Sequence, residues 1–210
     1  EAPAAGSYRS IFKWGDPLGF KHPNKRLYRM MKKVFHLSDE HFKKPVSTGN
    51  DPVDLGGRPV LIDRLHIEKL KEISGSENVS TADYDRLKYS TGMTVEEAME
   101  LRQKKIAEVC DVVVHPRNKE EVAKIVAYCD AQGLPLYVYG GGSGVNFGVR
   151  PAKGGVTLVM MTHMNRLLEL DEKNQTARVE AGIFGPEYER LLNNAPGLYG
   201  TKRRYTNGHF

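Results

Sequence analysis

Residues 134–151 read LPLYVYGGGSGVNFGVRP, and this stretch decides the fold. An apolar run containing Leu136 and Val138 ends at Gly140, where a series of glycines begins. Because glycine has no Cβ, successive N–H groups can point into one concavity, and a ligand can approach the main chain closely. The pattern therefore predicts a strand that leads directly into an anion-binding loop, which we call the glycine loop. A flexible surface loop is the alternative.

The glycine loop does not follow either of the two most familiar phosphate-binding patterns. A P-loop ends in Gly-Lys-Ser/Thr, whereas no lysine follows here before Lys153. A G-x-G-x-x-G fingerprint counted from Gly140 reaches Val145 at the third glycine, and counted from Gly142 it reaches Phe147. We therefore expect a different way of holding a phosphate.

The surrounding sequence predicts an α/β unit. A β-branched run at 110–116 is followed by a helix at 118–133, with Asn118 as its N-cap and Gly133 as its end. A second strand at 135–139 enters the glycine loop, and a third strand follows at 155–161. We expect the first two strands to be parallel neighbours, with the glycine loop at the carboxyl edge where such sheets bind ligands.

Outside this unit, local patterns predict mainly helices and one hairpin. Residues 1–23 look extended and 45–60 look like a loop, whereas 61–73 has a helical pattern. Two capping boxes, Ser80 with Asp83 and Thr94 with Glu97, predict two helix starts. Residues 166–171 and 176–182 flank a polar turn and predict a β-hairpin, followed by a helix with Pro186 near its start.

Residues 24–37 form an amphipathic pattern with a strongly basic face. The apolar stripe comprises Leu27, Met30, Met31, Val34 and Phe35, and the surrounding cations are Lys25, Arg26, Arg29, Lys32 and Lys33. One interpretation is a helix that docks on its own protein with its basic face in solvent. The other is peripheral contact with a membrane surface.

The charge, the histidine spacing and the cysteine content argue against several other classes of function. The net charge of +5 is scattered along the chain, so we predict no nucleic-acid partner. The histidines show no metal-ligand spacing, so we predict no metal site, and Ser143 has no identifiable base for hydrolysis. Cys129 is expected in the core, and with only two cysteines a reducing, cytoplasmic location is expected. For His115, either a site-lining role or a strand-end hydrogen bond is open.

From about residue 84 onward the chain resembles the vanillyl-alcohol-oxidase (PCMH-type) flavoproteins. The residues that carry the resemblance are DRLKYSTG (85–92), VVVHP (112–116), EEVAKIVAYC (120–129), GLPLYVYGGGSGVNFG (133–148), MNRLLELDEKNQTARVEAGIFGPEYERLL (164–192) and NGHF (207–210). Residues 164–192 are most similar to the alkyldihydroxyacetonephosphate synthases and their bacterial relatives. That group has Thr-Ser where this chain has Ser143-Gly144, and the family usually has Pro-Asp where Cys110-Asp111 stands here.

The resemblance implies an FAD enzyme with an α+β fold. We expect a mostly helical region at 1–105 and an incomplete FAD-binding domain at 106–210, which holds the first α/β lobe and the start of the second. The residues implied to hold the FAD pyrophosphate are Gly140, Gly141, Gly142, Ser143, Gly144, Val145 and Asn146. Catalytic residues are expected downstream of the NGHF segment, so the chain is read as part of a longer protein.

The implied reaction acts on a small-molecule substrate. The synthase-like prediction is the exchange of an acyl for an alkyl group in ether lipid synthesis. The alternative is an FAD-linked dehydrogenase of lactate- or glycolate-like 2-hydroxyacids, and an alternative of another class is a non-catalytic nucleotide-binding or structural module. A homodimer and association with a membrane are left open.

Overall fold

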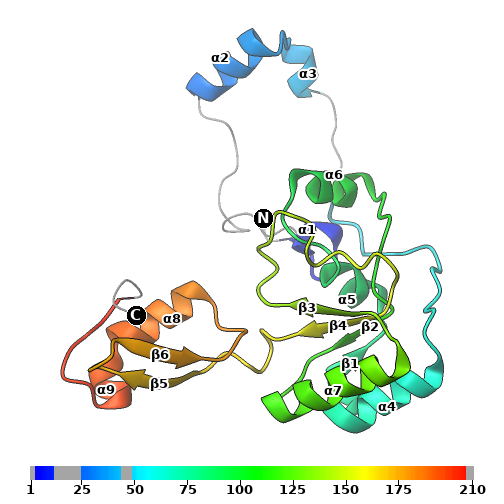
Figure 1. Ribbon diagram of the computed structural model, residues 1–210. Helices are drawn as coiled ribbons and strands as arrows, with labels where there is room; N and C mark the ends of the chain where they lie inside the picture. The colour runs from blue at the N-terminus through cyan, green and yellow to red at the C-terminus, as the bar shows by residue number, and fades with distance from the viewer. Residues whose placement is uncertain (1–2, 12–24, 44–48, 207–210) are drawn as a thin grey trace. The chain divides into compact units, whose positions relative to one another are not determined.

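The computed structural model describes residues 3–11, 25–43 and 49–206 of the chain (Figure 1). The chain divides into two compact units, one formed by residues 1–53 and 95–106 and the other by residues 54–94 and 107–210. The sequence predicts one boundary, between residues 105 and 106. The two compact units differ from that prediction, because residues 54–94 supply a strand and two helices that pack on the sheet of the second unit. The predicted extent of the FAD-binding domain stays a prediction.

The first unit is helical in its described residues. It contains α1 (Tyr8–Ile11), α2 (Lys25–Val34), α3 (Asp39–Lys43) and α6 (Val95–Gln103). Tyr8, Ile11 and Leu101 are buried where α1 and α6 meet. The turn at α1 corrects the expectation of an extended segment at 1–23, of which residues 1–2 and 12–23 lie outside the described residues. The helix predicted from the basic amphipathic pattern is confirmed as α2.

A four-stranded sheet forms the centre of the second unit, in the order β1-β2-β4-β3. Its strands are β1 (Val79–Ser80), β2 (Val112–Val114), β3 (Leu136–Tyr139) and β4 (Val156–Val159). β4 is parallel to both β2 and β3, and β1 is antiparallel to β2. The prediction that β2 and β3 are neighbours is therefore wrong. All four residues of β4 are buried, so this strand takes the centre, whereas Val138 of β3 is 58% exposed at the edge.

Alternate residues of the strands pack on opposite faces of this sheet. On one face, Val112, Val114 and Leu158 pack with α4 (Arg64–Ser74) and α7 (Lys119–Gln132). On the other, Val113 and Val159 pack with Tyr139 and with Tyr89, which follows α5 (Asp83–Lys88). Figure 1 shows α4 and α7 together on the side of the sheet away from α5. Both faces of the parallel strands are thus covered, as the apolar sequence of β2 and β4 requires.

The helix ends show which capping patterns form. Asn118 Oδ1 accepts the N–H of Glu121 at 2.9 Å, and Gly133 adopts a left-handed conformation, as predicted for α7. The prediction that Ser80 starts a helix with a capping box is wrong, because α5 begins after Ala82. The hydroxyl of Ser80 instead donates to Asp85 Oδ2 and accepts the N–H of Ala82, which places Ser80 before the helix start.

A second small layer follows the sheet in the chain. β5 (Leu167–Asp171) and β6 (Thr176–Val179) form the predicted antiparallel hairpin, covered by α8 (Gly185–Asn193) and α9 (Ala195–Tyr199). Leu167, Leu192 and Ala195 are buried between them. The α+β class is confirmed, with one parallel lobe and the start of an antiparallel one. Among the described residues, no helix is long and apolar enough to cross a membrane.

Candidate cofactor site

The carboxyl ends of the three parallel strands lie at one edge of the sheet. β3 ends at Tyr139 and passes directly into the glycine loop at Gly140. β2 is followed by His115, and β4 is followed within three residues by Thr162. His115 Nδ1 and Thr162 Oγ1 are 2.7 Å apart, so two neighbouring strands are linked just beyond their ends. This is the edge at which parallel α/β sheets bind ligands.

Several successive main-chain N–H groups of the glycine loop are available to donate hydrogen bonds to a ligand. In the part of the chain that the structure describes, the N–H groups of residues 141–145 donate to no protein acceptor. Gly142 has a φ of +65°, a conformation that glycine adopts without strain. The N–H of Met93 donates to the carbonyl of Gly144 at 2.8 Å, which turns that carbonyl toward residue 93. A row of free amides at a strand end suits an anion.

Each predicted site residue can be placed in the glycine loop. Gly142 is buried, Gly140 and Gly141 are half-buried, and Ser143, Gly144, Val145 and Asn146 are exposed. A Cβ built on Gly141 would stand 2.9 Å from Cε1 of Phe184, so only glycine fits beside that ring without movement. Asn146 Oδ1 accepts the N–H of Gly148 at 3.3 Å, so its side chain faces its own loop.

An aromatic cluster packs around Tyr139, the last residue of β3 before the glycine loop. The ring of Tyr89 packs edge-on against Tyr139, with centroids 5.1 Å apart, and against His115 at 5.2 Å. The ammonium of Lys88 lies 4.9 Å from the centroid of the Tyr89 ring. Burial lowers the pKa of His115, Asp85 opposes this shift, and the nearby charges of His163 and Lys88 add to it. His115 therefore makes the strand-end hydrogen bond to Thr162 and also packs against Tyr89 of the aromatic cluster.

Several of these neighbours have no signal in the sequence alone. Met93, Thr162 and Phe184 lie in irregular segments, and nothing in their own segments links them to the glycine loop. Tyr89 belongs to the stretch that carries the family resemblance, yet no periodic pattern shows that it contacts Tyr139. Sequence reasoning identified the loop and missed the side chains that hold it.

The two cysteines do not contribute to this chemistry. Both are free and buried. Burial raises the pKa of the Cys129 thiol to about 11, and it also raises the pKa of Cys110. The prediction that Cys129 is a core residue is confirmed, since its side chain packs against α4 and the sheet. In the described residues, no group of three or more His, Cys, Asp or Glu side chains could hold a metal ion.

The available amides at the strand end suit an anionic ligand, and the comparisons with known proteins point to a flavin cofactor. Residues 110–206 match the model of the FAD binding domain family. Glycolate oxidase subunit GlcD of Bacillus subtilis is 34% identical over 132 residues, covering 63% of this chain and 26% of the relative. Alkyldihydroxyacetonephosphate synthase of Caenorhabditis elegans is 32% identical over 127 residues, covering 59% of this chain and 20% of the relative.

Solved structures show the same fold. An alkyldihydroxyacetonephosphate synthase structure aligns with a TM-score of 0.73 at 21% identity, covering 88% of this chain and 38% of that one. A 4-ethylphenol oxidase from Gulosibacter chungangensis aligns with a TM-score of 0.52 at 25% identity, covering 67% of this chain and 26% of that one. The chain thus matches only a fifth to a quarter of these curated relatives' length. Residues 110–206 are thus similar to an FAD binding domain, and FAD is the cofactor that the comparisons support.

Proposed function

We propose that the glycine loop, residues Gly140 to Asn146, holds the pyrophosphate of FAD through its backbone amides. The observation that carries this proposal is the row of N–H groups at 141–145 that donate to no protein acceptor among the described residues. Phosphate oxygens accept such hydrogen bonds strongly because they are charged. The hydroxyl of Ser143 is exposed on the same loop and adds one more donor.

The residues of this chain bind and orient the cofactor. FAD itself supplies the redox or group-transfer chemistry through its isoalloxazine ring. Phe184, 44% exposed, lies against the main chain at Gly141. Tyr89 and Tyr139 fix the strand end from which the loop starts.

The direct test measures bound flavin. Full-length protein is purified as wild type and as Gly141→Val, and FAD per chain is determined from the visible absorbance after gel filtration. We expect FAD in the wild type and its loss in Gly141→Val, because the branched side chain collides with Phe184 and blocks the main chain. Normal flavin content in a folded Gly141→Val protein would place the pyrophosphate elsewhere.

For the whole enzyme we propose a synthase-like reaction, the exchange of an acyl for an alkyl group on a small phosphorylated ketone. Support comes from the synthase structure, whose alignment extends over 88% of this chain and thus into its helical region. The competing proposal is oxidation of a glycolate- or lactate-like 2-hydroxyacid, supported by the similarity to the glycolate oxidase subunit GlcD.

The two reactions differ in what they do to the flavin. A 2-hydroxyacid reduces FAD, so anaerobic mixing with glycolate or lactate would bleach the visible flavin absorbance. The exchange has no net redox change, so a fatty alcohol with acyl-dihydroxyacetone phosphate would give ether product and free fatty acid while the flavin stays oxidised. A flavin-containing protein that supports neither reaction would contradict both proposed activities.

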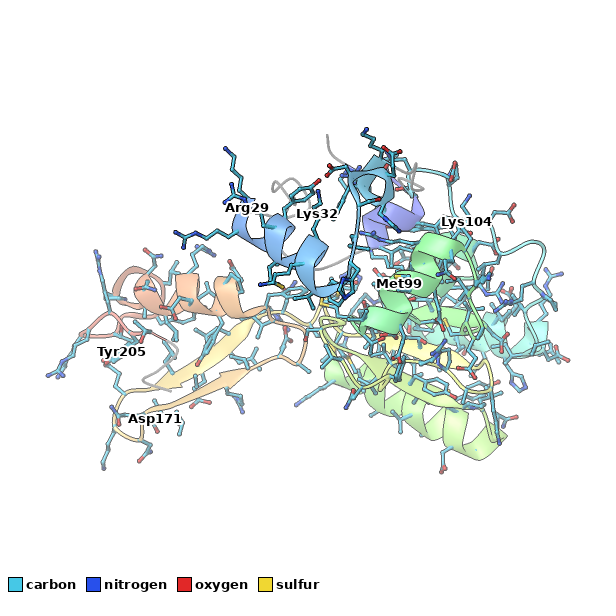
Figure 2. All side chains as sticks on the ribbon, turned by 90° about the horizontal axis from the view of Figure 1, so that it is seen from above. Arg29, Lys32, Met99, Lys104, Asp171 and Tyr205 are labelled. Carbon is cyan, nitrogen blue, oxygen red and sulfur yellow. The ribbon has the colours of Figure 1, made fainter. Side chains whose placement is uncertain are left out.

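We also propose that α2 contacts a membrane surface. Neither α2 nor α3 has a buried residue, and Met30, Val34 and Phe35 are 47%, 56% and 62% exposed. Arg29 and Lys32 are labelled on α2 in Figure 2, where Arg29 extends away from the helix. Apolar and basic side chains on one helix suit an anionic lipid interface. In this proposal the protein is cytoplasmic, and a homodimer remains a prediction of the sequence.

Vesicle co-sedimentation tests the membrane contact. Full-length protein should bind vesicles containing phosphatidylserine more than pure phosphatidylcholine vesicles, and Met30→Glu with Val34→Glu should abolish binding. Equal recovery of the wild type and the double variant in the supernatant would show that α2 does not bind these vesicles.

A further inference from the structure

A main-chain hydrogen bond from residue 93 ties the glycine loop to another segment of the second unit. The N–H of Met93 donates to the carbonyl oxygen of Gly144 at 2.8 Å. In the part of the chain that the structure describes, no other hydrogen bond joins the main chain of residues 141–146 to another segment. Met93 lies between α5 and α6, before the residues that match the FAD binding domain family. A residue outside the matched domain therefore contacts the loop directly.

This hydrogen bond fixes the direction of the next N–H group along the loop. The peptide bond between Gly144 and Val145 is trans, and a trans peptide is planar. The carbonyl of one residue and the N–H of the next therefore point in opposite directions. Because the carbonyl of Gly144 is directed at Met93, the N–H of Val145 is directed away from Met93. Val145 is 60% exposed, and its N–H donates to no protein acceptor within the described ranges, so it is available to a ligand.

The glycine content of the loop explains why this anchor matters. Glycine has the widest range of φ and ψ angles, so its peptide planes are held only weakly by the chain itself. A Cβ on Gly144 would have Asn146 Oδ1 as its nearest neighbour, at 3.5 Å, so the space around Gly144 does not restrict its rotation either. Without the bond from Met93, the peptide could turn over and present its carbonyl oxygen, which repels an anion, in place of the N–H.

We propose that Met93 is a positioning residue whose main-chain N–H orients the N–H of Val145 toward the FAD pyrophosphate. This inference rests on the proposed function of the glycine loop. Met93 touches no cofactor atom in this role and acts through the peptide between Gly144 and Val145. A donor that is already oriented loses less conformational entropy when the cofactor binds, so the affinity for the cofactor is higher.

Proline at residue 93 removes this N–H with little other change to the main chain. The preceding residue is Gly92, which has no Cβ to clash with the proline ring. α6 begins at Val95, so the proline would stand before the helix and interrupt no helical hydrogen bond. Met93→Ala is the conservative counterpart, because it removes the side chain and keeps the N–H. The two variants separate the main-chain hydrogen bond from the packing of the Met93 side chain.

The test measures the Kd for FAD by fluorescence titration of full-length apo-protein. We expect Met93→Pro to raise the Kd roughly tenfold, because FAD must then order the peptide itself, and Met93→Ala to stay within about twofold of the wild type. Urea unfolding of the apo-proteins shows whether both variants are folded at the temperature of the titration. A Kd for folded Met93→Pro equal to that of Met93→Ala would overturn the proposal.

A double-mutant cycle tests whether Met93 acts through Val145. Val145→Pro removes the N–H that is proposed to donate to the pyrophosphate, and it breaks no hydrogen bond made within the described part of the chain. We expect the Kd of the double variant to lie within about twofold of that of Val145→Pro, because the group that Met93 orients is already absent. Fold-changes that multiply in the double variant would show that Met93 acts elsewhere, against the proposal.

Gly141→Val separates this failure from that of the proposed function. If folded Gly141→Val retains FAD, the glycine loop does not hold the pyrophosphate. If Gly141→Val loses FAD while Met93→Pro binds it as Met93→Ala does, only the positioning role of Met93 is wrong.

Hydrogen exchange of the wild-type protein tests the proposal should Met93→Pro not fold. In apo-protein we expect slow exchange at the amide of Met93, which is bonded to Gly144, and fast exchange at the amide of Val145. Addition of FAD should protect Val145. Fast exchange of Met93 in the apo-protein, or an amide of Val145 that FAD does not protect, would contradict the proposal.

Discussion

The phenyl ring of Phe184 occupies the space that a side chain on Gly141 would need, with Cε1 only 2.9 Å from a Cβ built there. Phe184 is the residue just before α8, and Gly141 lies in the glycine loop. The contact joins the hairpin layer to the parallel sheet at the point where the pyrophosphate is proposed to bind. Since the ring is 44% exposed, a small side chain at residue 141 could displace it.

Gly141→Ala should therefore lower FAD affinity, and Phe184→Ala in the same chain should restore part of it. The second change removes the ring that the new methyl group meets. FAD titration of both variants and of Phe184→Ala alone gives the comparison. If the double variant binds FAD no better than Gly141→Ala, steric pressure from Phe184 is not the reason for the glycine.

Gly142→Ala should destabilise the apo-protein by about 1 kcal/mol, because a side chain is strained at the left-handed φ of this residue. Gly140→Ala is the matched control, since its φ is not positive and its nearest contact, the carbonyl of Ala181, would be 3.8 Å away. Urea unfolding measures both. Equal unfolding free energies for the two variants would contradict the strain at Gly142.

His115 should make the stability of the domain depend on pH. Burial lowers the pKa of its imidazole in the folded state, so the unfolded chain takes up a proton at higher pH than the folded one. The contribution of His115 is thus fully present above its unfolded pKa, near 6.5, and is lost as the pH falls from there toward the folded pKa. Urea unfolding between pH 7.5 and 5.5 should show a smaller loss in His115→Gln. An identical slope in wild type and variant would exclude this role.

Cys129 should be unreactive in the folded protein. With a pKa of about 11, its thiol is almost fully protonated at pH 8, and the side chain is buried against α4 and the sheet. Labelling with a thiol reagent at pH 8 should be slow in buffer and fast in denaturant. Rapid labelling of Cys129 in native protein, identified by peptide mapping, would show that this helix face opens.

The sequence by itself determined the local elements. Asn118 and Gly133 delimit α7 because caps act within a single turn of helix. The hairpin of β5 and β6 and the glycine loop after β3 follow in the same way from alternation and from glycine content. These patterns involve neighbouring residues, so they can be read without knowledge of the rest of the chain.

Tertiary structure decided what surrounds the loop. β4, rather than β3, lies beside β2 because it is buried on both faces, and Ala82 rather than Ser80 precedes α5 because Ser80 bonds to Asp85. Asp111 binds Leu61 and Gly155, which are 50 and 44 residues away in the sequence. A polar side chain can satisfy its hydrogen bonds with any amide that the folded chain brings near. Only the packed structure therefore shows which amides a buried carboxylate such as Asp111 binds.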